Sequence, residues 1–218
     1  MNHASRNRLT DRHLERFPGE SLFDRIARAV CRAGCLPRKE LYEAWEVARR
    51  VRRRLRGGRI IDLACGHGLL SSILLLLDDS SPHALGIDRA LPPSAGKLQT
   101  VLENAWPRLA GRVELRRGEL EEVALTADDL VVSVHACGGL TDRVMDLAIA
   151  ARARLAVLPC CHELASGSGV ELRGWLDGAL AMDVARVGRL QAAGYRVVTQ
   201  TIPAEITPKN RLLLAEPE

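Results

Sequence analysis

The sequence predicts an α/β protein in which helices cover both faces of a mostly parallel β-sheet. Three observations lead to this prediction. Short apolar runs, typical of buried strands, alternate along the chain with longer segments that have a helical pattern. The glycines Gly66 and Gly68 follow the first of these strands and open the next helix. Two later strands lead into cysteine and histidine residues, at the sheet edge where this class of fold binds ligands.

The composition indicates one domain with a short extension. A chain of 218 residues with 47% hydrophobic residues can bury one sizeable core. The first residues lack the apolar stretch of a signal peptide, and the most apolar run, Leu69 to Leu77, is shorter than the about 20 residues that span a bilayer. The six cysteines have no framework spacing, which favours reduced thiols. We therefore expect a soluble cytoplasmic protein without membrane contact.

The amino-terminal part is predicted to be helical and basic. Residues 1–20 are polar and without periodicity, so we expect a mobile basic tail there. Ser21 is a candidate cap for a helix that ends near Gly34, and a second helix begins at Pro37 and ends at Gly57 and Gly58. Residues 21–57 thus form a helical basic extension.

Arginines crowd the second helix and the residues after it. One interpretation assigns no specific function to them: they form a solvated helix face in an arginine-rich protein that has three lysines. The other interpretation is a surface that contacts RNA phosphates, because clustered guanidinium groups are typical of nucleic-acid binding. An aromatic content of 3% gives little support to base stacking. The RNA hypothesis rests on Arg49, Arg50, Arg52, Arg53, Arg54 and Arg56, with Arg59 close by.

The stretch around the first strand has the pattern of a nucleotide-binding start. Ile60 and Ile61 lead into Asp62, which we expect at the strand end, within reach of a cationic amino group. The spacing D-x-A-x-G-x-G resembles motif I of class I S-adenosylmethionine (SAM)-dependent methyltransferases, with Ala64 in place of the first glycine. The dinucleotide fingerprint of NAD-dependent enzymes, G-x-G-x-x-G without an acid ahead of it, fits less well. An ordinary strand-to-helix turn is the alternative without function.

Six further strands and three helices follow in order. The helices are expected from Leu98 to Leu109, from a Thr141 cap, and over one long segment from Val170 to Ala193 that ends at Gly194. The strands are expected at His83–Asp88, Arg112–Arg116, Asp129–Val134, Leu155–Leu158, Tyr195–Thr201 and Arg211–Ala215. With the first strand they make a Rossmann-like sheet of seven strands. The methyltransferase resemblance implies that the last two form an antiparallel hairpin, whose loop holds Lys209.

Acidic residues after the second and third strands complete the expected cofactor site. Asp88 lies about 20 residues beyond Gly68, where a carboxylate in this kind of unit accepts the two ribose hydroxyls. In the methyltransferase family an acid at the third strand end bonds the adenine amino group, which makes Glu119 the candidate, with the Leu120 amide near the ring. A surface glutamate without function is the alternative. The expected cofactor-binding set is Asp62, Ala64, Cys65, Gly66, Gly68, Asp88, Glu119, Leu120 and His135.

Two further motifs sharpen the resemblance. HACGGLTD (His135 to Asp142) and LPCCHE (Leu158 to Glu163) resemble one class I branch. This branch includes tRNA acceptor-stem 2'-O-ribose methyltransferases and glutathione S-transferase C-terminal-domain-containing proteins. The resemblance covers roughly Gly57 to the end, so residues 58–218 are predicted to be the methyltransferase domain. It implies SAM as the cofactor, whereas the substrates of the branch differ and the zinc-finger modules of its tRNA enzymes are absent here.

The cysteines and histidines at the strand ends allow three interpretations. A catalytic role would let His135 or His162 take a proton from the acceptor, with Cys160 beside them. Methyl transfer to an amine needs mainly positioning, so a base is more useful for a hydroxyl acceptor. Alternatively, these side chains only line and pack the pocket. No pair has the C-x-x-C spacing of structural zinc sites, so we expect no metal.

The sequence therefore predicts SAM-dependent methyl transfer, with RNA (tRNA or rRNA) as the preferred acceptor. A small molecule or a protein side chain is the alternative acceptor. A non-catalytic SAM- or RNA-binding protein that keeps the fold is the alternative from another functional class.

Overall fold

The computed structural model describes residues 3–160, 162 and 169–218, and its centre is a seven-stranded sheet. The strand order is β3-β2-β1-β4-β5-β7-β6, with β1 to β5 parallel and β7 antiparallel to both neighbours. This confirms the Rossmann-like fold class and the antiparallel carboxyl-terminal hairpin. The strands are β1 (Ile60–Leu63), β2 (Ala84–Asp88), β3 (Val113–Arg117), β4 (Leu130–Ser133), β5 (Arg154–Val157), β6 (Tyr195–Thr201) and β7 (Arg211–Pro217).

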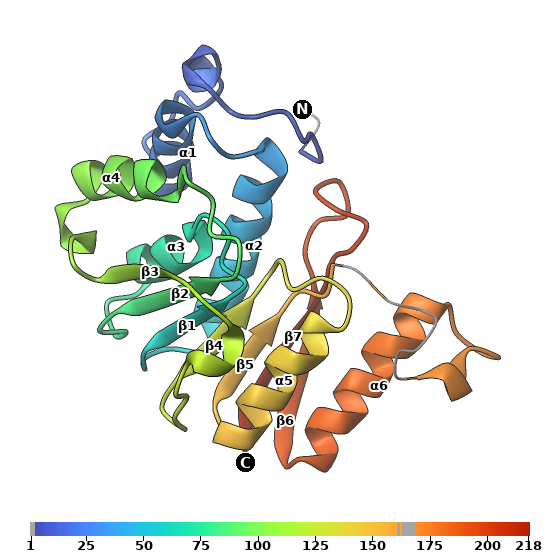
Figure 1. The fold of residues 1–218 in the computed structure, drawn as a ribbon. Helices are drawn as coiled ribbons and strands as arrows, with labels where there is room; N and C mark the ends of the chain where they lie inside the picture. Colours follow the sequence, from blue (N-terminus) through green and yellow to red (C-terminus); the bar gives the residue numbers. More distant parts are fainter. Residues whose placement is uncertain (1–2, 161, 163–168) are drawn as a thin grey trace.

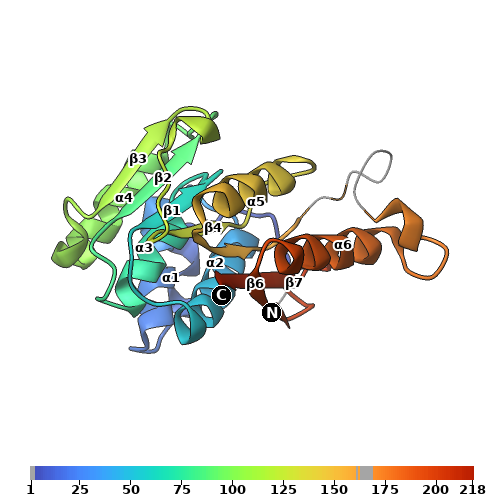
Figure 2. The same cartoon turned by 90° about the horizontal axis from the view of Figure 1, so that it is seen from below.

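Helices lie on both faces of the sheet (Figures 1 and 2). The helices α1 to α4 pack on one face, and α5 and α6 cover the other. Their bounds are α1 (Leu22–Ala33), α2 (Arg38–Arg54), α3 (Leu69–Leu77), α4 (Ala95–Ala105), α5 (Leu140–Ala151) and α6 (Gly178–Ala192). The described residues also include four short 3-10 helices, η1 (Asp11–Arg16), η2 (Pro107–Leu109), η3 (Leu120–Glu122) and η4 (Val170–Leu172).

Strand alternation divides the buried side chains between two cores. Ile60 and Val132 point into the core shared with α1 to α4, whereas Ile61 and Val131 point into the core under α5. Successive strand residues face opposite sides of a sheet, so both faces of β1 and β4 must be apolar. The burial of every β1 residue, Asp62 included, follows from this central position.

The amino-terminal segment differs from the expected mobile tail. Its described part lies against α1 and α2, with Leu9 and Phe17 buried and η1 between them. The Leu9 amide donates to the Leu36 carbonyl at 2.9 Å, and Arg8 forms a bridge with Pro37. Leu9 and Phe17 pack this segment against the helices. The mostly polar sequence has no periodicity that would predict their burial.

Two helix starts also differ from the expectation. The predicted segment from Val170 to Ala193 divides into η4 and α6, because the Asp177 side chain accepts from the amides of Ala179 and Leu180 and caps a new helix. Thr141 does not cap α5. Its hydroxyl donates to the Ala136 carbonyl at 2.6 Å.

Within the described residues, no helix combines the length and the apolar character needed to cross a bilayer.

Candidate functional site

The loop between β1 and α3 turns sharply at the carboxyl edge of the sheet. Ala64, Gly66 and Gly68 have φ angles of 60°, 53° and 72°, in the left-handed region. A Cβ atom on Gly68 would lie 2.5 Å from Leu115 Cδ2, so a side chain here would require Leu115 to move in addition to the strain of the positive φ. The turn therefore brings backbone close to whatever binds at this edge.

Asp88 ends β2 and holds this loop in place. Its Oδ2 accepts from the Gly66 amide at 2.9 Å, and its Oδ1 accepts from the Ala90 amide at 2.8 Å. A carboxylate oxygen can accept more than one hydrogen bond, so both oxygens keep capacity for hydroxyl groups. The predicted ribose-binding residue is thus tied to the predicted glycine turn.

A hollow of about 300 Å³ lies beside Asp88 at the ends of the first three strands. Four of the predicted cofactor residues, Ala64, Asp88, Glu119 and Leu120, line it together with Arg89, Gly118, Leu140 and Arg143. Glu119 forms an ion pair with Arg89. The Arg89 guanidinium donates to its carboxylate at 2.8 Å, and this hydrogen bond lowers the pKa of Glu119.

Asp62 lies inside β1, one residue before its end, and is only 2% exposed. The Ser71 hydroxyl of α3 donates to its Oδ2 at 2.8 Å. Burial raises the pKa of Asp62 to about 7, and the nearby Asp88 charge adds to this, although the Ser71 hydrogen bonds oppose it. Asp62 thus lies within the sheet beside the glycine turn, and it is more buried than the strand-end position that the sequence predicted.

A second, small cavity of about 20 Å³ brings Asp62 together with Cys65, His67 and His135. The His67 Nε2 lies 2.9 Å from the Ser94 hydroxyl. Partial burial lowers the pKa of His135, and Lys39 lowers it further, although the side chain keeps access to solvent. Among the described residues, no three histidine, cysteine, aspartate or glutamate side chains are grouped so that they could hold a metal ion.

His162 lies against α6 and is buried. Its side chain is 2% exposed, and its Nε2 lies 2.9 Å from Asp183 Oδ1. Arg186 and Arg211 also donate to Asp183. A buried ring in an ion-pair network reaches an acceptor less easily than His135 does. The two predicted catalytic histidines therefore differ in their access to a methyl acceptor.

The loops after β4 and β5 meet at two thiols. The Cys137 and Cys160 sulfur atoms lie 3.0 Å apart. Cys161 and Glu163, which the sequence motif included, lie outside the described residues.

The arginine cluster lies at the opposite edge of the sheet, because α2 ends at Arg54 and β1 begins at Ile60. Arg52 is buried and donates to the carbonyls of Leu74 and Leu55 and to the Ser81 hydroxyl, so it is not part of the surface. Arg49 and Arg50 pair with Glu46. The exposed members are Arg53, Arg54 and Arg56.

Several residues that line the two cavities were not predicted from the sequence. Glu40 of α2 lines the small cavity, and burial raises its pKa. Arg89 and Arg143 line the larger hollow. No local pattern distinguishes these charged residues from solvated ones. The packing of α2 and α5 brings Glu40 and Arg143 to the site, and Arg89 directly follows β2.

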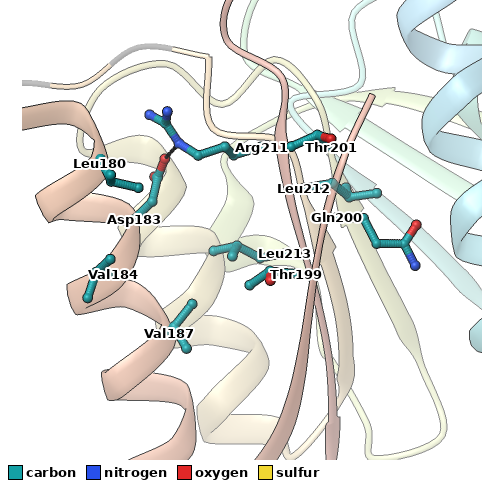
Figure 3. A pocket seen from close by; sticks show the side chains of 10 residues that line it. All are labelled: Leu180, Asp183, Val184, Val187, Thr199, Gln200, Thr201, Arg211, Leu212 and Leu213. Atoms are coloured by element: carbon teal, nitrogen blue, oxygen red, sulfur yellow. Dashed lines mark hydrogen bonds and ion pairs between the residues drawn. The ribbon is translucent and has the colours of Figure 1, made fainter. Parts of the chain in front are cut away.

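A cavity of about 430 Å³ lies between α6 and the β6–β7 hairpin (Figure 3). Leu180, Val184 and Val187 line it from the helix, and Leu213 and Thr199 from the strands. The Asp183–Arg211 ion pair, at 2.6 Å, lies at one end. This mainly apolar cavity is separate from the predicted cofactor residues.

Comparisons with known proteins agree with this architecture. The B. subtilis m1A22 tRNA methyltransferase TrmK is 17% identical at a TM-score of 0.50, over 81% of this chain and 65% of TrmK. The mitomycin 7-O-methyltransferase MmcR is 18% identical at 0.53, over 94% and 60%. The pyocyanin biosynthetic protein PhzM is 18% identical at 0.53, over 96% and 62%. The chain thus spans less than two thirds of each, and the likeness is one of fold.

No curated protein matches the chain in sequence. A family model described as a methyltransferase domain matches residues 39–167, which is more than half of the 218 residues. The match takes in α2, which the sequence analysis had assigned to an extension. The chain therefore belongs to this family of methyltransferase domains, for which SAM is the implied methyl donor.

Proposed function

We propose that this chain is a SAM-dependent methyltransferase that modifies RNA, either tRNA or rRNA. The observation that carries the methyltransferase assignment is the clustering of Ala64, Asp88, Glu119 and Leu120 around one hollow beside the glycine turn. These residues suit adenosine: Asp88 offers acceptors for ribose hydroxyls, and the apolar Ala64 and Leu120 suit a flat ring. The family match agrees with this assignment.

SAM, when bound, supplies an electrophilic methyl group on a sulfonium. The chain supplies position and proton transfer. Asp88 and the Ala64–Gly68 turn would hold the nucleoside, and Asp62 would face the amino acid portion. His135 lies at the end of β4 with solvent access, and its lowered pKa keeps the imidazole neutral at pH 7. A neutral imidazole can accept the proton of an acceptor hydroxyl.

Cations at the carboxyl edge support an RNA acceptor. Lys39 lies in the first turn of α2, where its charge lowers the pKa of His135, Lys97 lies in the first turn of α4, and Lys209 is exposed in the β6–β7 loop. All three lysines of the chain thus belong to segments at this edge, where phosphates would need to be held. The tRNA specificity in TrmK's name and the resemblance of the His135–Asp142 motif to ribose methyltransferases point in the same direction.

A small-molecule acceptor is the second candidate, supported by the fold that the chain shares with MmcR. The cavity under α6 is separate from the predicted cofactor residues, so it is too remote to hold this acceptor during methyl transfer. The name of MmcR states such an acceptor for that protein. A protein side chain is a further alternative, which no feature of the structure favours.

The test is methyl transfer from labelled SAM into an extract of cells that lack the gene, followed by separation of RNA, protein and small molecules. Label in RNA that is lost in His135→Ala supports the proposal. Asp88→Ala should weaken SAM binding roughly 10- to 100-fold, since charge-assisted hydrogen bonds are lost. Glu114→Ala, at an exposed β3 position, is the matched control. Label only in small molecules would overturn the RNA acceptor, and absence of both SAM binding and label would overturn the enzyme.

A further inference from the structure

We propose that Cys137 and Cys160 form a reversible disulfide that cross-links the loops after β4 and β5. Their sulfur atoms already lie 3.0 Å apart, about 1 Å longer than a disulfide bond. This inference goes beyond methyl transfer, because it concerns how the thiol state of the chain controls the two loops.

The sheet itself creates this approach. β4 and β5 are parallel neighbours with Ser133 opposite Val157, and the Leu158 amide donates to the Ser133 carbonyl at 3.0 Å. Cys137 follows the end of β4 by four residues and Cys160 follows the end of β5 by three, so the two backbones leave adjacent strands together. Adjacent strands are about 4.8 Å apart, within the range of Cα separations that disulfides bridge after a small adjustment.

The pair is also accessible, unlike the other described cysteines. Cys137 is exposed and Cys160 is partly buried, whereas Cys31, Cys35 and Cys65 are buried. Burial raises the pKa of Cys31 to about 11 and also raises that of Cys65, which makes them poor nucleophiles. Among the described cysteines, the Cys137–Cys160 pair is therefore the one that a soluble oxidant reaches.

The chemistry balances with glutathione disulfide as the oxidant. The Cys137 thiolate attacks one sulfur of glutathione disulfide and releases one glutathione thiolate. The Cys160 thiolate then attacks the Cys137 sulfur of the mixed disulfide and releases the second glutathione. Overall, the two protein thiols lose two protons and two electrons, and glutathione disulfide is reduced to two thiols. Excess glutathione reverses both steps.

The cross-link would fix the segment that carries His135. Cys137 lies two residues after His135, and Cys160 lies two residues before His162. The disulfide closes a loop of the chain that contains α5 and β5. Oxidation therefore ties the start of this loop to its end at the binding edge of the sheet. A chain-entropy effect should raise the melting temperature by roughly 5–10 °C.

The experiment equilibrates the full chain in glutathione buffers of defined ratio, traps the remaining thiols with an alkylating agent, and measures intact mass and melting temperature. Cys160 and Cys161 fall on the same tryptic peptide, so single variants must decide between them. In wild type and in Cys161→Ser we expect two fewer alkylated thiols than in the reduced protein, no added glutathione mass, and the higher melting temperature, all reversed by reduction. Cys137→Ser and Cys160→Ser should lose both effects.

A disulfide that persists in Cys160→Ser but disappears in Cys161→Ser would overturn the assignment, as would only mixed glutathione disulfides. Stoichiometric zinc that both thiols bind and that blocks alkylation would also overturn it. None of these measurements requires methyl transfer, so a failure of the proposed function leaves the result readable.

Discussion

Single backbone angles explain the composition of the loop that follows β1. Ala64 has φ of 60°, the conformation that the glycine usual at this motif position adopts without strain. For an L residue the left-handed region costs about 1–2 kcal/mol. Ala64 therefore replaces the usual glycine of the motif and keeps the backbone conformation of that glycine.

Replacement of Ala64 by glycine should stabilise the protein. Strain relief of about 1–2 kcal/mol exceeds the added unfolded-state entropy of glycine, about 0.5–1 kcal/mol, so we expect a gain near 0.5–1 kcal/mol in the free energy of unfolding. Urea denaturation measures it. Ala150→Gly, at an exposed position of α5, is the control and should lose stability. Equal losses in both variants would show that Ala64 is not strained.

Asp62 gives a pH-dependent stability. Its pKa, raised to about 7 by burial, means that the folded protein holds the proton more tightly than the unfolded chain. Its contribution is fully present below the unfolded pKa near 4 and is lost as pH rises through about 7. Asp62→Asn keeps the neutral shape, so relative to wild type it should gain on the order of 2–3 kcal/mol between about pH 5 and pH 8.

Urea denaturation at several pH values measures this difference. Asp129→Asn is the control, because hydrogen bonds from Arg59 and Thr126 outweigh burial and lower the pKa of Asp129. Its difference from wild type should stay constant above pH 5. A constant difference for Asp62→Asn as well would mean that Asp62 is already ionised at pH 5.

At the scale of elements, an ion-pair network fixes α6 to the rest of the domain. Arg186 of α6 is 1% exposed and joins Asp183 of its own helix to Asp142 of α5. Asp183 in turn accepts from Arg211 of β7 and contacts His162 after β5. Loss of Arg186 would remove charge-assisted hydrogen bonds from both carboxylates, although Asp183 would keep Arg211 and His162, and Asp142 would keep Arg189.

Arg186→Leu should therefore lower the free energy of unfolding by roughly 1.5–3 kcal/mol, measured by urea denaturation. Arg189→Ala is the matched control on the same helix. Arg189 is 34% exposed and pairs with Asp146 and Asp142, so its loss should cost about 1 kcal/mol or less. Similar effects of the two variants would show that the buried network does not hold α6.

At the scale of the whole molecule, positive charge lies at both edges of the sheet. The lysine-bearing segments lie at the carboxyl edge with the proposed site. Arg53 and Arg54 lie at the amino edge, where they border a hollow with Arg196 and Glu216. An RNA that used both would have to extend across the domain.

This arrangement makes a testable distinction. Arg53→Ala with Arg54→Ala should reduce the slope of log affinity against log salt by about 1 for each phosphate contact that is lost. Titration of labelled RNA at several salt concentrations measures the slope. Arg116→Ala, exposed on the edge strand β3, is the control. An unchanged slope in the double variant, with a reduced slope in Lys209→Ala, would place RNA at the carboxyl edge alone.

Local pattern was sufficient for most of the fold. Apolar runs predicted the central strands, because central parallel strands are buried on both faces, and alternation predicted the edge strands β3 and β6. All seven predictions agree with the structure to within two residues at each end. Local pattern failed for the amino-terminal segment and for the start of α6. In the first case long-range burial of Leu9 and Phe17 outweighs a polar composition, and in the second a single Asp177 cap divides the helix.

The sequence by itself determined the fold class, the glycine turn and the presence of an acid near the end of β1 and at the end of β2, since each depends on residues close together in the chain. Only the tertiary structure decided that Asp62 is buried, that His162 lies in an ion-pair network while His135 meets solvent, and that Arg52 is internal. It also decided the contact between Cys137 and Cys160. The physical reason is that burial and ion pairing depend on elements brought together across the sheet, and no local periodicity encodes those partners.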